Sequence, residues 1–449
     1  MTKLGMHVGF DDTDSYRGGC TTYAAALIIE KLMKLGVSFA DYPLLVRLNP
    51  NVPWKTRGNG ALCLRIICGD SLKEKVKELA IETIEEESDL EAKGTDPGIV
   101  FLEGEVPKEV EDFAERTITG VVTMREALRL VKKFGAEANG YNGGRGIIGG
   151  LAAIGAQLRG DHTFECITYR VEENRGTPRR IDESSVAAMD RQLAPSVYNN
   201  VDPETGRVLI TPRGPDPILY GIRGETPEAV RRAREIVVSL EPVERWVVYK
   251  TNQGTDAHLR KVVSISDVRP HNPVIVKGEV AAQPHIIQGG HTIFQIRDET
   301  GTVDCAAYEP TGVLRNAAIK LIWGDFVELC GGVRPKSPRN PMTVNVEKMR
   351  IVKLAPFMEA RNPLCPNCGK RTKSMGKGQG FECPKCGFHG PRLEKTYVEV
   401  ERPISLGLFI SSSRSQRHLT KPIGRYGLEK TETQRNADSI VPYDSFCGH

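Results

Sequence analysis

The sequence predicts a multidomain protein that combines α/β and α+β domains, and three features of the chain support this. A length of 449 residues is too great for one ordinary hydrophobic core, so three or four domains of about 100–150 residues are expected. Predicted strands and helices alternate over the first 160 residues, whereas short alternating strands dominate from residue 272. Two CxxC pairs lie close together within residues 365–386, which is typical of a small metal-stabilised domain.

The composition is normal for a soluble protein, with 26% charged and 39% hydrophobic residues. No stretch approaches the roughly 20 uninterrupted apolar residues of a membrane span, and the N-terminus lacks a secretory pattern. We therefore expect a cytoplasmic protein without membrane contact. Residues 361–449 hold 15 Lys and Arg against 8 Asp and Glu, a net charge of +7, so the rest of the chain carries −3. A basic tail on a slightly acidic body suggests that a polyanion is held at one end.

The segment after the first predicted strand, residues 6–10, is the richest in candidate catalytic groups. It places three carboxylates within four residues, Asp11, Asp12 and Asp14, and their repulsion is costly unless a cation or a solvated turn absorbs the charge. It then supplies backbone donors, a cation and hydroxyls, namely Arg17, Gly18, Gly19, Thr21 and Thr22. Because a predicted helix over residues 22–35 also begins near these threonines, the segment suits triphosphate chemistry with a bound Mg²⁺. The simpler interpretation is a polar turn with a helix N-cap, for which one carboxylate suffices.

In the remainder of the first domain, the sequence pattern predicts strands at 43–48, 61–68 and 99–103 and helices at 71–93 and 123–134. The loop over residues 49–60 carries Trp54, Lys55 and Arg57. An aromatic ring beside two cations suits a nucleotide or a nucleobase, and a plain surface connection is an equally good interpretation.

A glycine-rich stretch over residues 139–150 is the second candidate phosphate site. Six glycines in twelve residues precede a predicted helix over 151–158, which suggests a loop whose backbone amides approach an anion. The candidate residues are Asn142, Gly143, Gly144, Arg145 and Gly146. The stretch fits neither the Walker nor the dinucleotide pattern, and glycines could equally serve tight packing of a helix on a strand.

Residues 163–256 predict approximately the order βαββαβ, which suggests a ferredoxin-like sandwich. The predicted strands are 164–171, about 197–200, about 206–211, 217–223 and 244–250, and the predicted helices are 183–193 and 226–239. Three polar loops at strand ends carry Asp182, Asp216 and Asp256. These carboxylates could line one cleft for a cationic small molecule, or they could lie in ordinary solvated loops.

From residue 272 the strands follow the order of an OB-fold, with a helix at 311–321 between the third and fourth strands. The predicted strands are 274–280, 291–297, 302–308, 325–330 and 343–354. OB-folds bind nucleic acid on one face, so an RNA or single-stranded DNA partner is the leading interpretation. Fold analogy alone does not prove binding.

The most specific local signal is the pair of CxxC motifs, which 14 residues separate: Cys365, Cys368, Cys383 and Cys386. This spacing matches a zinc ribbon, in which four thiolates fill the coordination of a structural Zn²⁺ and leave no open position for catalysis. The ribbon would present the basic loop at 370–377. The seven other cysteines are scattered, which indicates a reducing compartment rather than a disulfide framework.

Beyond the ribbon, residues 394–400 are strand-like, and the segment 411–421 carries Arg414, Arg417 and His418. We interpret this segment as an RNA-contacting tail, with disorder as the competing explanation. The expected domain limits are 1–160, 161–258, 270–356, 360–395 and a basic tail at 396–449.

The motif order resembles one known family. That order is Gly9-Phe-Asp-Asp-Thr-Asp with Gly-Cys-Thr-Thr, then Asn-Gly-Gly-Arg-Gly-Ile-Ile-Gly, then Thr251-Asn-Gln-Gly-Thr-Asp, followed by an OB-fold and a zinc ribbon. In the order of its motifs the chain resembles the archaeal tRNA(Ile) 2-agmatinylcytidine synthetases, the TiaS family. The resemblance covers essentially the whole chain. It implies a kinase-like domain that uses ATP, a ferredoxin-like domain, an OB-fold and a zinc ribbon.

The resemblance also implies a reaction. The family attaches agmatine to carbon 2 of the cytidine at the first anticodon position of isoleucine tRNA with a CAU anticodon, which changes decoding from AUG to AUA. ATP is consumed to AMP, and the threonine after the Gly-x-Cys segment, Thr21 by motif, becomes autophosphorylated. The implied cofactors are ATP, Mg²⁺ and Zn²⁺, and no obligate protein partner is expected.

Two other functions remain open at this point. A non-catalytic RNA- or single-stranded-DNA-binding factor could use the OB-fold and ribbon, but it does not explain the aspartate segment with the glycine-rich stretch. An ATP-dependent ligase for a different RNA base or amine would use the same residues. Magnesium-dependent release of AMP in the presence of tRNA would separate both enzymes from the binding factor.

Overall fold

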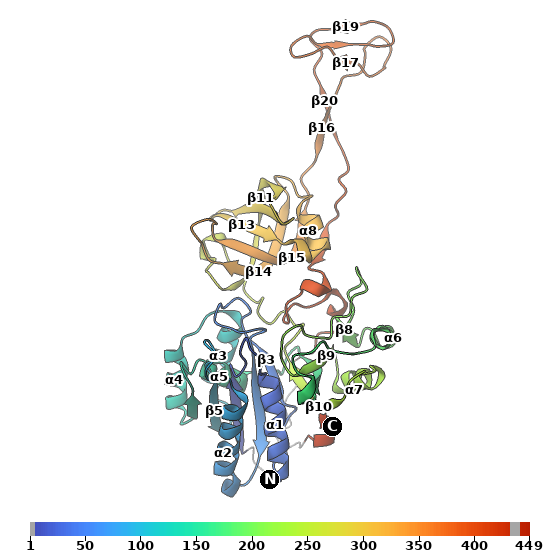
Figure 1. The fold of residues 1–449 in the computed structure, drawn as a ribbon. Helices are drawn as coiled ribbons and strands as arrows, with labels where there is room; N and C mark the ends of the chain where they lie inside the picture. The colour runs from blue at the N-terminus through green and yellow to red at the C-terminus, as the bar shows by residue number, and fades with distance from the viewer. Residues whose placement is uncertain (1–4, 432–440) are drawn as a thin grey trace.

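The computed structural model describes residues 5–431 and 441–449. It shows a body of two α/β domains, a β-barrel stacked on that body, and a small ribbon on a long arm (Figure 1). No helix in the described part of the chain is long and apolar enough to cross a bilayer. The expected limits 1–160 and 396–449 include residues 1–4 and 432–440, which lie outside the described residues.

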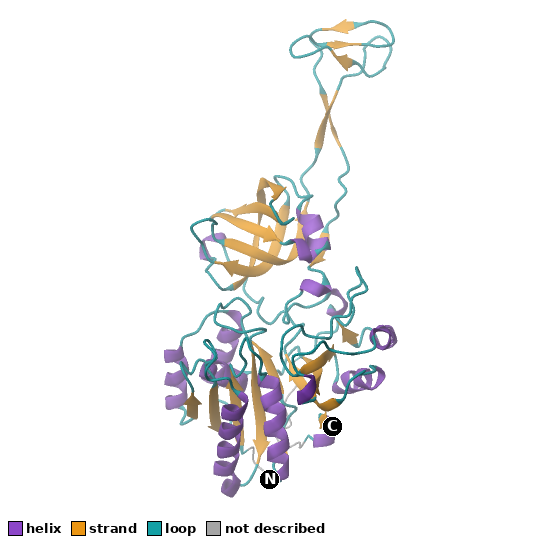
Figure 2. Cartoon of the chain, in the orientation of Figure 1, coloured by secondary structure: helices purple, strands orange, loops and turns teal. Residues whose placement is uncertain are grey.

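The first domain is an antiparallel sheet with helices on both faces, as Figure 2 shows. Its strands are β1 (Met6–Asp11), β2 (Ser38–Phe39), β3 (Leu44–Arg47), β4 (Gly60–Ile67), β5 (Gly98–Glu103) and β6 (Glu137–Gly140). Its helices are α1 (Thr21–Lys34), α2 (Asp70–Glu87), α3 (Lys108–Thr119), α4 (Met124–Lys133) and α5 (Gly146–Gly155). Helix α3 is not among the expected helices, although its buried residues recur at helical spacing after Pro107, from Val110 and Phe113 to Ile118.

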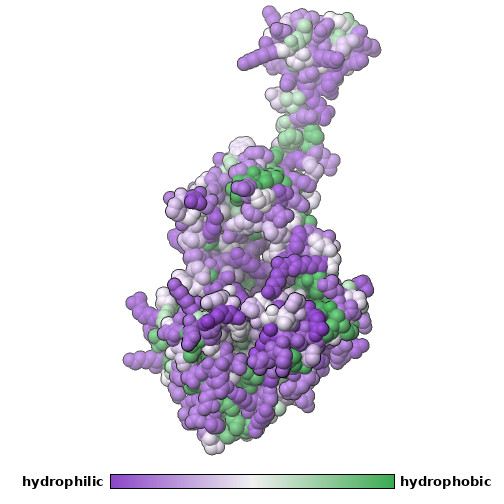
Figure 3. Space-filling view, viewed as in Figure 1, coloured by the Kyte–Doolittle hydropathy of each residue, from purple (hydrophilic) through white to green (hydrophobic). Residues whose placement is uncertain are grey.

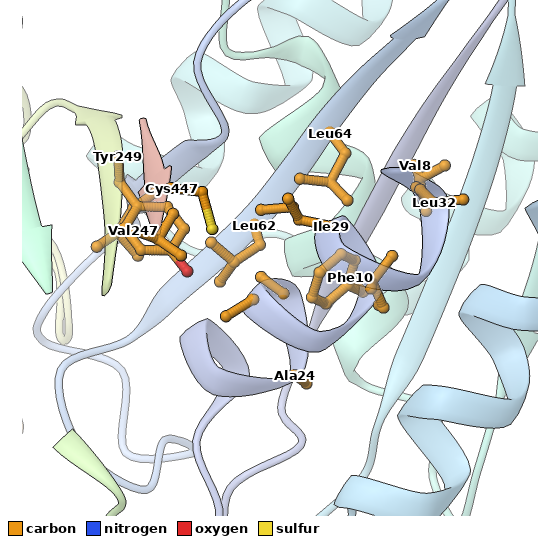
Figure 4. Close-up of a cluster of buried hydrophobic side chains, with 14 of the residues drawn as sticks. Val8, Phe10, Ala24, Ile29, Leu32, Leu62, Leu64, Val247, Tyr249 and Cys447 are labelled. Carbon is orange, nitrogen blue, oxygen red and sulfur yellow. The ribbon is translucent and has the colours of Figure 1, made fainter. Parts of the chain in front are cut away.

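Successive side chains of a strand point to opposite faces of the sheet, so the hydrophobic core has two halves, one on each face. Leu62 and Leu64 of β4 pack with helix α1 on one face, where Figure 4 shows Phe10 and Ile29 beside them. Ala61 and Cys63 of the same strand face helices α3, α4 and α5 on the other. The sheet therefore carries α1 and α5 on opposite faces, and the first residues of each helix belong to one of the two candidate phosphate segments.

The second domain continues the same sheet. Its strands β7 (Thr163–Arg170), β8 (Val197–Tyr198), β9 (Ile218–Gly224) and β10 (Val243–Thr251) take the antiparallel order β10-β7-β9-β8, and β10 pairs in parallel with β3. Helices α6 (Glu183–Leu193) and α7 (Pro227–Ile236) complete the order βαββαβ, with the 3-10 turn η1 at Glu172–Asn174. The additional strand expected near 206–211 is wrong, because only an isolated bridge between Val201 and Val208 forms around the turn.

The third domain is a five-stranded closed barrel, as the OB-like order predicts. The strands are β11 (Pro273–Ile286), β12 (Thr292–Asp298), β13 (Gly301–Ala307), β14 (Phe326–Arg334) and β15 (Thr343–Lys353), and β13 pairs with β15 to close it. Helix α8 (Val313–Ala318) lies between β13 and β14 in the chain, and η2 (Ile265–Asp267) and η3 (Glu309–Thr311) are 3-10 turns.

The ribbon stands away from the body on an arm of two antiparallel strands, β16 (Met358–Arg361) and β20 (Thr396–Glu399). It is a three-stranded sheet of β17 (Lys373–Ser374), β18 (Phe381–Glu382) and β19 (His389–Gly390). Figure 3 shows a mostly hydrophilic ribbon surface above an apolar stretch of the arm, where Met358, Tyr397 and Val398 are exposed.

The chain then returns to the body through residues 407–431, which we call the C-terminal strap. Strand β21 (Gly407–Ile410) joins the barrel sheet, and the strap contains η4 (Ser413–Ser415) and η5 (Ile423–Arg425). The final residues form η6 (Tyr443–Ser445) and β22 (Cys447–Gly448), which pairs with β10. An isolated bridge between Val441 and Phe39 joins the same tail to the first domain, so the C-terminal tail is built into three domains.

This arrangement changes the interpretation of the basic tail. Arg414 pairs with Asp202 and Glu204 at 2.9 and 2.6 Å. The fully buried Arg425 pairs with Asp161 and Glu225 at 2.9 and 2.5 Å. Neither disorder nor an RNA-contacting role for Arg414 agrees with these contacts, because its positive charge is already matched by carboxylates of the body.

Candidate active site

A cavity of about 460 Å³ lies where the first two domains meet. Its wall comes from the start of α1, the loop over residues 49–60, the start of α5, strands β7 and β9, and the strap. Seven of the predicted site residues line it: Asp11, Asp12, Asp14, Thr21, Thr22, Arg145 and Asp216. The two segments singled out in the first domain therefore meet at one site.

Asp11 and Asp12 form a strained, desolvated acidic pair at the end of β1. Asp12 has φ of 63°, and its backbone N–H donates to Asp11 Oδ1 at 2.7 Å. Burial and the Asp12 charge raise the pKa of Asp11 well above its usual value. Burial also raises the pKa of Asp12 to about 6, although Arg145 donates to its Oδ2 at 2.8 Å and opposes the shift. A ligand that brings positive charge would relieve this pair.

We predict that Asp12→Asn makes the free energy of unfolding less dependent on pH. Because the folded protein raises this pKa from 3.8 to about 6, protonated Asp12 contributes stability below about pH 4 that is lost as the pH rises through 6. The wild type should lose on the order of 1.4 kcal/mol from this group between pH 5 and pH 8. Denaturant unfolding without ATP measures both proteins, and equal pH dependence in the two would contradict the assignment.

A second polar network connects the two domains across the cavity. Arg57 donates from Nε to Asp14 Oδ2 at 2.9 Å and from Nη2 to the Gly19 carbonyl at 2.7 Å. Its Nη1 lies 3.0 Å from Oδ2 of the buried Asp216, which also pairs with Arg179 at 3.1 Å. Arg57 therefore holds the aspartate segment of the first domain against a loop of the second.

Helix α1 begins in the cavity wall. Its N-cap residue, Cys20, makes no side-chain cap, and no acidic residue lies in the first turn. The Thr21 hydroxyl bonds to the Thr13 hydroxyl at 3.0 Å, and Tyr249 of the second domain donates to the Thr22 carbonyl at 2.7 Å. An uncapped helix start with two hydroxyls offers the donors that a phosphate group accepts.

Three residues of the predicted phosphate segment do not line the cavity. Arg17 makes a two-pronged ion pair with Asp89, with both bonds at 2.7 Å. Gly18 and Gly19 adopt left-handed φ values of 154° and 73°, and the Gly19 carbonyl accepts from Arg57. These residues shape the turn that leads into α1.

The glycine-rich stretch also differs from the expected open loop. The Gly143 amide donates to Asp96, and the Asn142 side chain donates to the carbonyls of Leu90 and Thr95, so these donors are already used. Gly144 has a φ of 59° in the same turn. Gly146 belongs to α5, where a Cβ would overlap the backbone of Asp11. Tight packing of a helix on a strand therefore explains Gly146, and Arg145 is the member of the set that reaches the cavity.

The three acidic loops of the second domain are not brought together. Asp182 is the N-cap of α6 and accepts from the Ser184 amide at 3.0 Å. Asp256 binds Lys348 of the barrel at 2.5 Å and the Lys421 amide of the strap at 2.7 Å. Only Asp216 lines the cavity, so the expectation of one cleft with all three carboxylates is wrong: the other two serve a helix end and a domain contact.

Several cavity residues were not among the predicted residues, including Arg47, Glu165, Tyr198 and Arg223. Arg47 ends β3, and Glu165 and Arg223 occupy facing strands β7 and β9. Charged residues inside otherwise apolar strands are the signal that could have indicated Arg47, Glu165 and Arg223. His418, which was expected to contact RNA as part of the tail, is brought to the cavity by the strap, and no local pattern reveals that placement.

The four cysteines of the ribbon form the one group of three or more candidate metal ligands that lie together in residues 5–431 and 441–449. Cys365 Sγ lies 3.6 Å from Cys386 Sγ, and Cys368 Sγ lies 3.4 Å from Cys383 Sγ. Thiolates around Zn²⁺ with bonds of ~2.3 Å are ~3.8 Å apart, so these residues fit a tetrahedral structural zinc. Asp11, Asp12 and Asp14 do not form such a group, since Asp12 and Asp14 turn toward arginines.

We predict that Cys368→Ser removes the zinc without unfolding the body. Metal analysis should fall from about one zinc per chain to near zero, because three thiolates hold the ion much less tightly. The main thermal transition should move by less than about 2 °C, since the ribbon stands apart on its arm. Retention of zinc, or loss of the main transition, would contradict the structural assignment. Cys330→Ser, in the barrel, is the matched cysteine control.

Comparison with known proteins shows the family to which the chain belongs. Models of the TiaS TCKD domain, the TiaS FLD domain and the TiaS C-terminal zinc ribbon domain match residues 7–143, 144–258 and 362–404. The tRNA 2-agmatinylcytidine synthetase TiaS of Methanosarcina mazei is 41% identical over 94% of this chain and 97% of its own length. The chain belongs to the TiaS family. The expected family is thereby confirmed, as is the mixed α/β fold with a closed barrel and a zinc ribbon.

Further members agree in sequence and structure. TiaS of Pyrococcus horikoshii is 43% identical over 93% of this chain and 96% of its own. The crystal structure of apo TiaS superposes with a TM-score of 0.83 at 39% identity and covers 94% of this chain and 98% of that one. A crystal structure of TiaS with an isoleucine tRNA and ATP gives 0.84 at 39% identity, over 94% and 97%. A complex of TiaS with an isoleucine tRNA, AMPCPP and agmatine gives 0.82 at 37% identity, with the same coverage.

Proposed function

We propose that this chain uses ATP to attach agmatine to carbon 2 of the cytidine at the first anticodon position of isoleucine tRNA with a CAU anticodon, here called the CAU tRNA. The product is 2-agmatinylcytidine, which permits decoding of AUA. The observation that carries the proposal is the cavity between the first two domains, where an uncapped helix start, cations and desolvated carboxylates meet. TiaS structures with an isoleucine tRNA, ATP and agmatine support the same substrates. Since tRNA would be its substrate, we expect the chain to work in the cytoplasm.

The chemistry explains the need for ATP. Carbon 2 of cytosine is a poor electrophile, because its carbonyl is conjugated with two ring nitrogens. Transfer of one phosphoryl group of ATP to the carbonyl oxygen makes that oxygen a leaving group, and AMP forms when the second phosphoryl group passes to the Thr21 hydroxyl or to water. The agmatine amine then forms the C–N bond, the C–O bond breaks with its electron pair on phosphate, and the amine releases a proton. Each step places negative charge on phosphate oxygens, which donors and cations stabilise.

The proposed roles follow from the geometry. Thr21, Thr22 and the first amides of α1 would bind phosphate oxygens, with Arg145 beside them. Asp11 and Asp12, with Asp14 nearby, would hold Mg²⁺ if the ion took the place of the arginines that Asp12 and Asp14 contact, and its charge would offset the raised pKa values of Asp11 and Asp12. Mg²⁺ held there would neutralise developing charge on the transferred phosphoryl group. Arg17, Gly18, Gly19 and the glycines at 143, 144 and 146 would shape these segments without binding the nucleotide.

Transfer of labelled agmatine tests the proposal. Purified chain is incubated with labelled agmatine, ATP, Mg²⁺ and the CAU tRNA, and a transcript with U in place of the anticodon C is the matched substrate control. We expect label in the CAU tRNA, release of AMP, and no label in the control or without ATP. Tight tRNA binding with no label and no AMP would instead indicate the RNA-binding factor. AMP release without label from agmatine would indicate a ligase for a different amine.

For agmatine itself we propose Asp216 as the recognition residue, since it is the predicted carboxylate of the second domain that lines the cavity. The agmatine cation would share this carboxylate with Arg57 and Arg179, which pair with it at 3.0 and 3.1 Å. Asp216→Asn should raise the agmatine KM about 10-fold while the ATP KM changes by less than about 2-fold, because a charged hydrogen bond to a cation is lost. Asp182→Asn is the control, since Asp182 caps α6 outside the cavity. An unchanged agmatine KM for Asp216→Asn would remove the assignment.

A further inference from the structure

One side of the cavity carries more positive than negative charge. Arg47 and Arg223 share one carboxylate, Glu165, at 3.8 and 3.2 Å. Lys55 adds an ammonium group that makes no ion pair within 4.0 Å in the described part of the chain, and its Nζ contacts only the Arg57 carbonyl, at 3.4 Å. Two guanidinium groups and one ammonium group thus face one carboxylate.

One of these cations, Arg47, is also incompletely hydrogen-bonded. Nε of Arg47 is buried without a hydrogen-bond partner among the described residues. A buried donor without a partner is costly, and bound ligands commonly resolve that cost. The carboxylates that could neutralise the group are used elsewhere, since Asp14 and Asp216 both pair with Arg57.

His418 of the strap completes this group. Its Nδ1 lies 3.0 Å from both Arg223 Nη2 and Gln253 Oε1. Burial and the charges of Arg47, Arg223 and Lys55 hold its pKa well below the usual value, so the ring is neutral. Burial and Arg417 similarly lower the pKa of Lys55. Burial is the larger cause of both pKa shifts, and the neighbouring cations that add to it give this part of the cavity a positive potential, which an anion would relieve.

Gly58 lets two of these groups approach the backbone closely. A Cβ at this position would lie 2.8 Å from Arg47 Nη1 and 2.8 Å from His418 Nε2. Any side chain at residue 58 would collide with both nitrogens, which come from strand β3 and the strap and belong to residues that line the cavity. Nitrogens that converge in this way suit the oxygens of a tetrahedral anion in the cavity.

We propose that Arg47, Lys55, Arg223 and His418 form a phosphate-binding subsite separate from the start of α1. The ligand is a phosphate group, which either ATP or the RNA backbone beside the target nucleotide supplies. The inference rests on the proposed function for this choice of ligands, but the subsite is a binding property and is measured without catalysis. It also gives the strap a role in the site, because the strap places His418 there.

The test measures binding of ATP and of the CAU tRNA to the full chain, each over a range of salt concentrations, in wild type and Lys55→Gln. If ATP supplies the phosphate, the ATP Kd should rise about 10-fold while the tRNA Kd changes by less than about 2-fold. If the RNA supplies it, the tRNA Kd should rise about 10-fold and the salt slope should fall by about one. Lys55→Arg, which keeps the charge, should restore most of the affinity.

The control is Lys75→Gln, which removes a cation from the exposed face of α2. Its ATP and tRNA affinities should match those of the wild type. The proposal is overturned if Lys55→Gln leaves both affinities within about 2-fold of wild type, or if Lys75→Gln weakens them equally. Because no agmatine is present, a failed agmatine transfer would not affect these outcomes, and a failed subsite would not affect the transfer assay.

Discussion

Asp12→Asn is expected to lower the rate of agmatine incorporation by about 10³-fold while the protein stays folded. The substitution removes a carboxylate that lines the cavity and that we propose to hold Mg²⁺. Asparagine tolerates the left-handed backbone that Asp12 adopts, with φ of 63°, and it can still accept from Arg145. The loss should therefore reflect chemistry rather than folding.

The measurement is kcat for incorporation of labelled agmatine, together with the melting temperature. Asp96→Asn is the matched control, because Asp96 pairs with the same arginine at 3.1 Å but does not line the cavity. We expect the control to lose less than about 10-fold. If Asp12→Asn kept more than a tenth of the wild-type kcat, Asp12 would not belong to the catalytic machinery.

Arg57→Gln is expected to lower both stability and activity. The change leaves Asp14 and the buried Asp216 without a guanidinium group that bridges them and the Gly19 carbonyl. Asp216 keeps its pair with Arg179 at 3.1 Å, so the cost should be below that of a fully unpaired buried carboxylate, about 2–4 kcal/mol, which should lower the Tm of the body by roughly 5–10 °C. Activity should fall by at least about 100-fold, because the aspartate segment loses its contact with the second domain.

Thermal unfolding and the agmatine-transfer rate test this together. Arg116→Gln is the control, since Arg116 makes an exposed ion pair with Glu126 that should contribute less than about 1 kcal/mol. Arg57→Lys should recover only part of the loss, because an ammonium group cannot reach all three acceptors. A Tm within about 2 °C of wild type for Arg57→Gln would show that the network does not hold the domains.

The sequence predicted the barrel and the ribbon closely because their signals are local. Alternating strands give the barrel order, and the four cysteines need only their spacing. The first domain was harder, since helix α3 lies in a charge-rich stretch that hides its apolar face. The additional strand near 206–211 failed because hydrophobic content alone does not provide a pairing partner.

The candidate site likewise contains residues that a local sequence signal reveals and residues that only the folded chain brings together. The aspartates at 11, 12 and 14 and the threonines at 21 and 22 were found because charge density and a helix start are visible in one segment. Arg47, Arg223 and His418 come from two strands and the strap, so only the folded chain brings them together. Asp182 and Asp256 were misassigned because a helix cap and a domain contact have the same polar sequence pattern as a binding loop.

The central claim is that one cavity couples ATP consumption to agmatine transfer, and the ratio of the two products tests it most directly. AMP released and agmatine incorporated into the CAU tRNA are measured in the same reaction for wild type and Thr21→Ala, whose hydroxyl lies at the start of α1 in the cavity. We predict about one AMP per agmatine in wild type, and loss of both products together in Thr21→Ala. Wild-type incorporation that proceeds without AMP, or a Thr21→Ala chain that keeps both products at wild-type rates, would contradict the account.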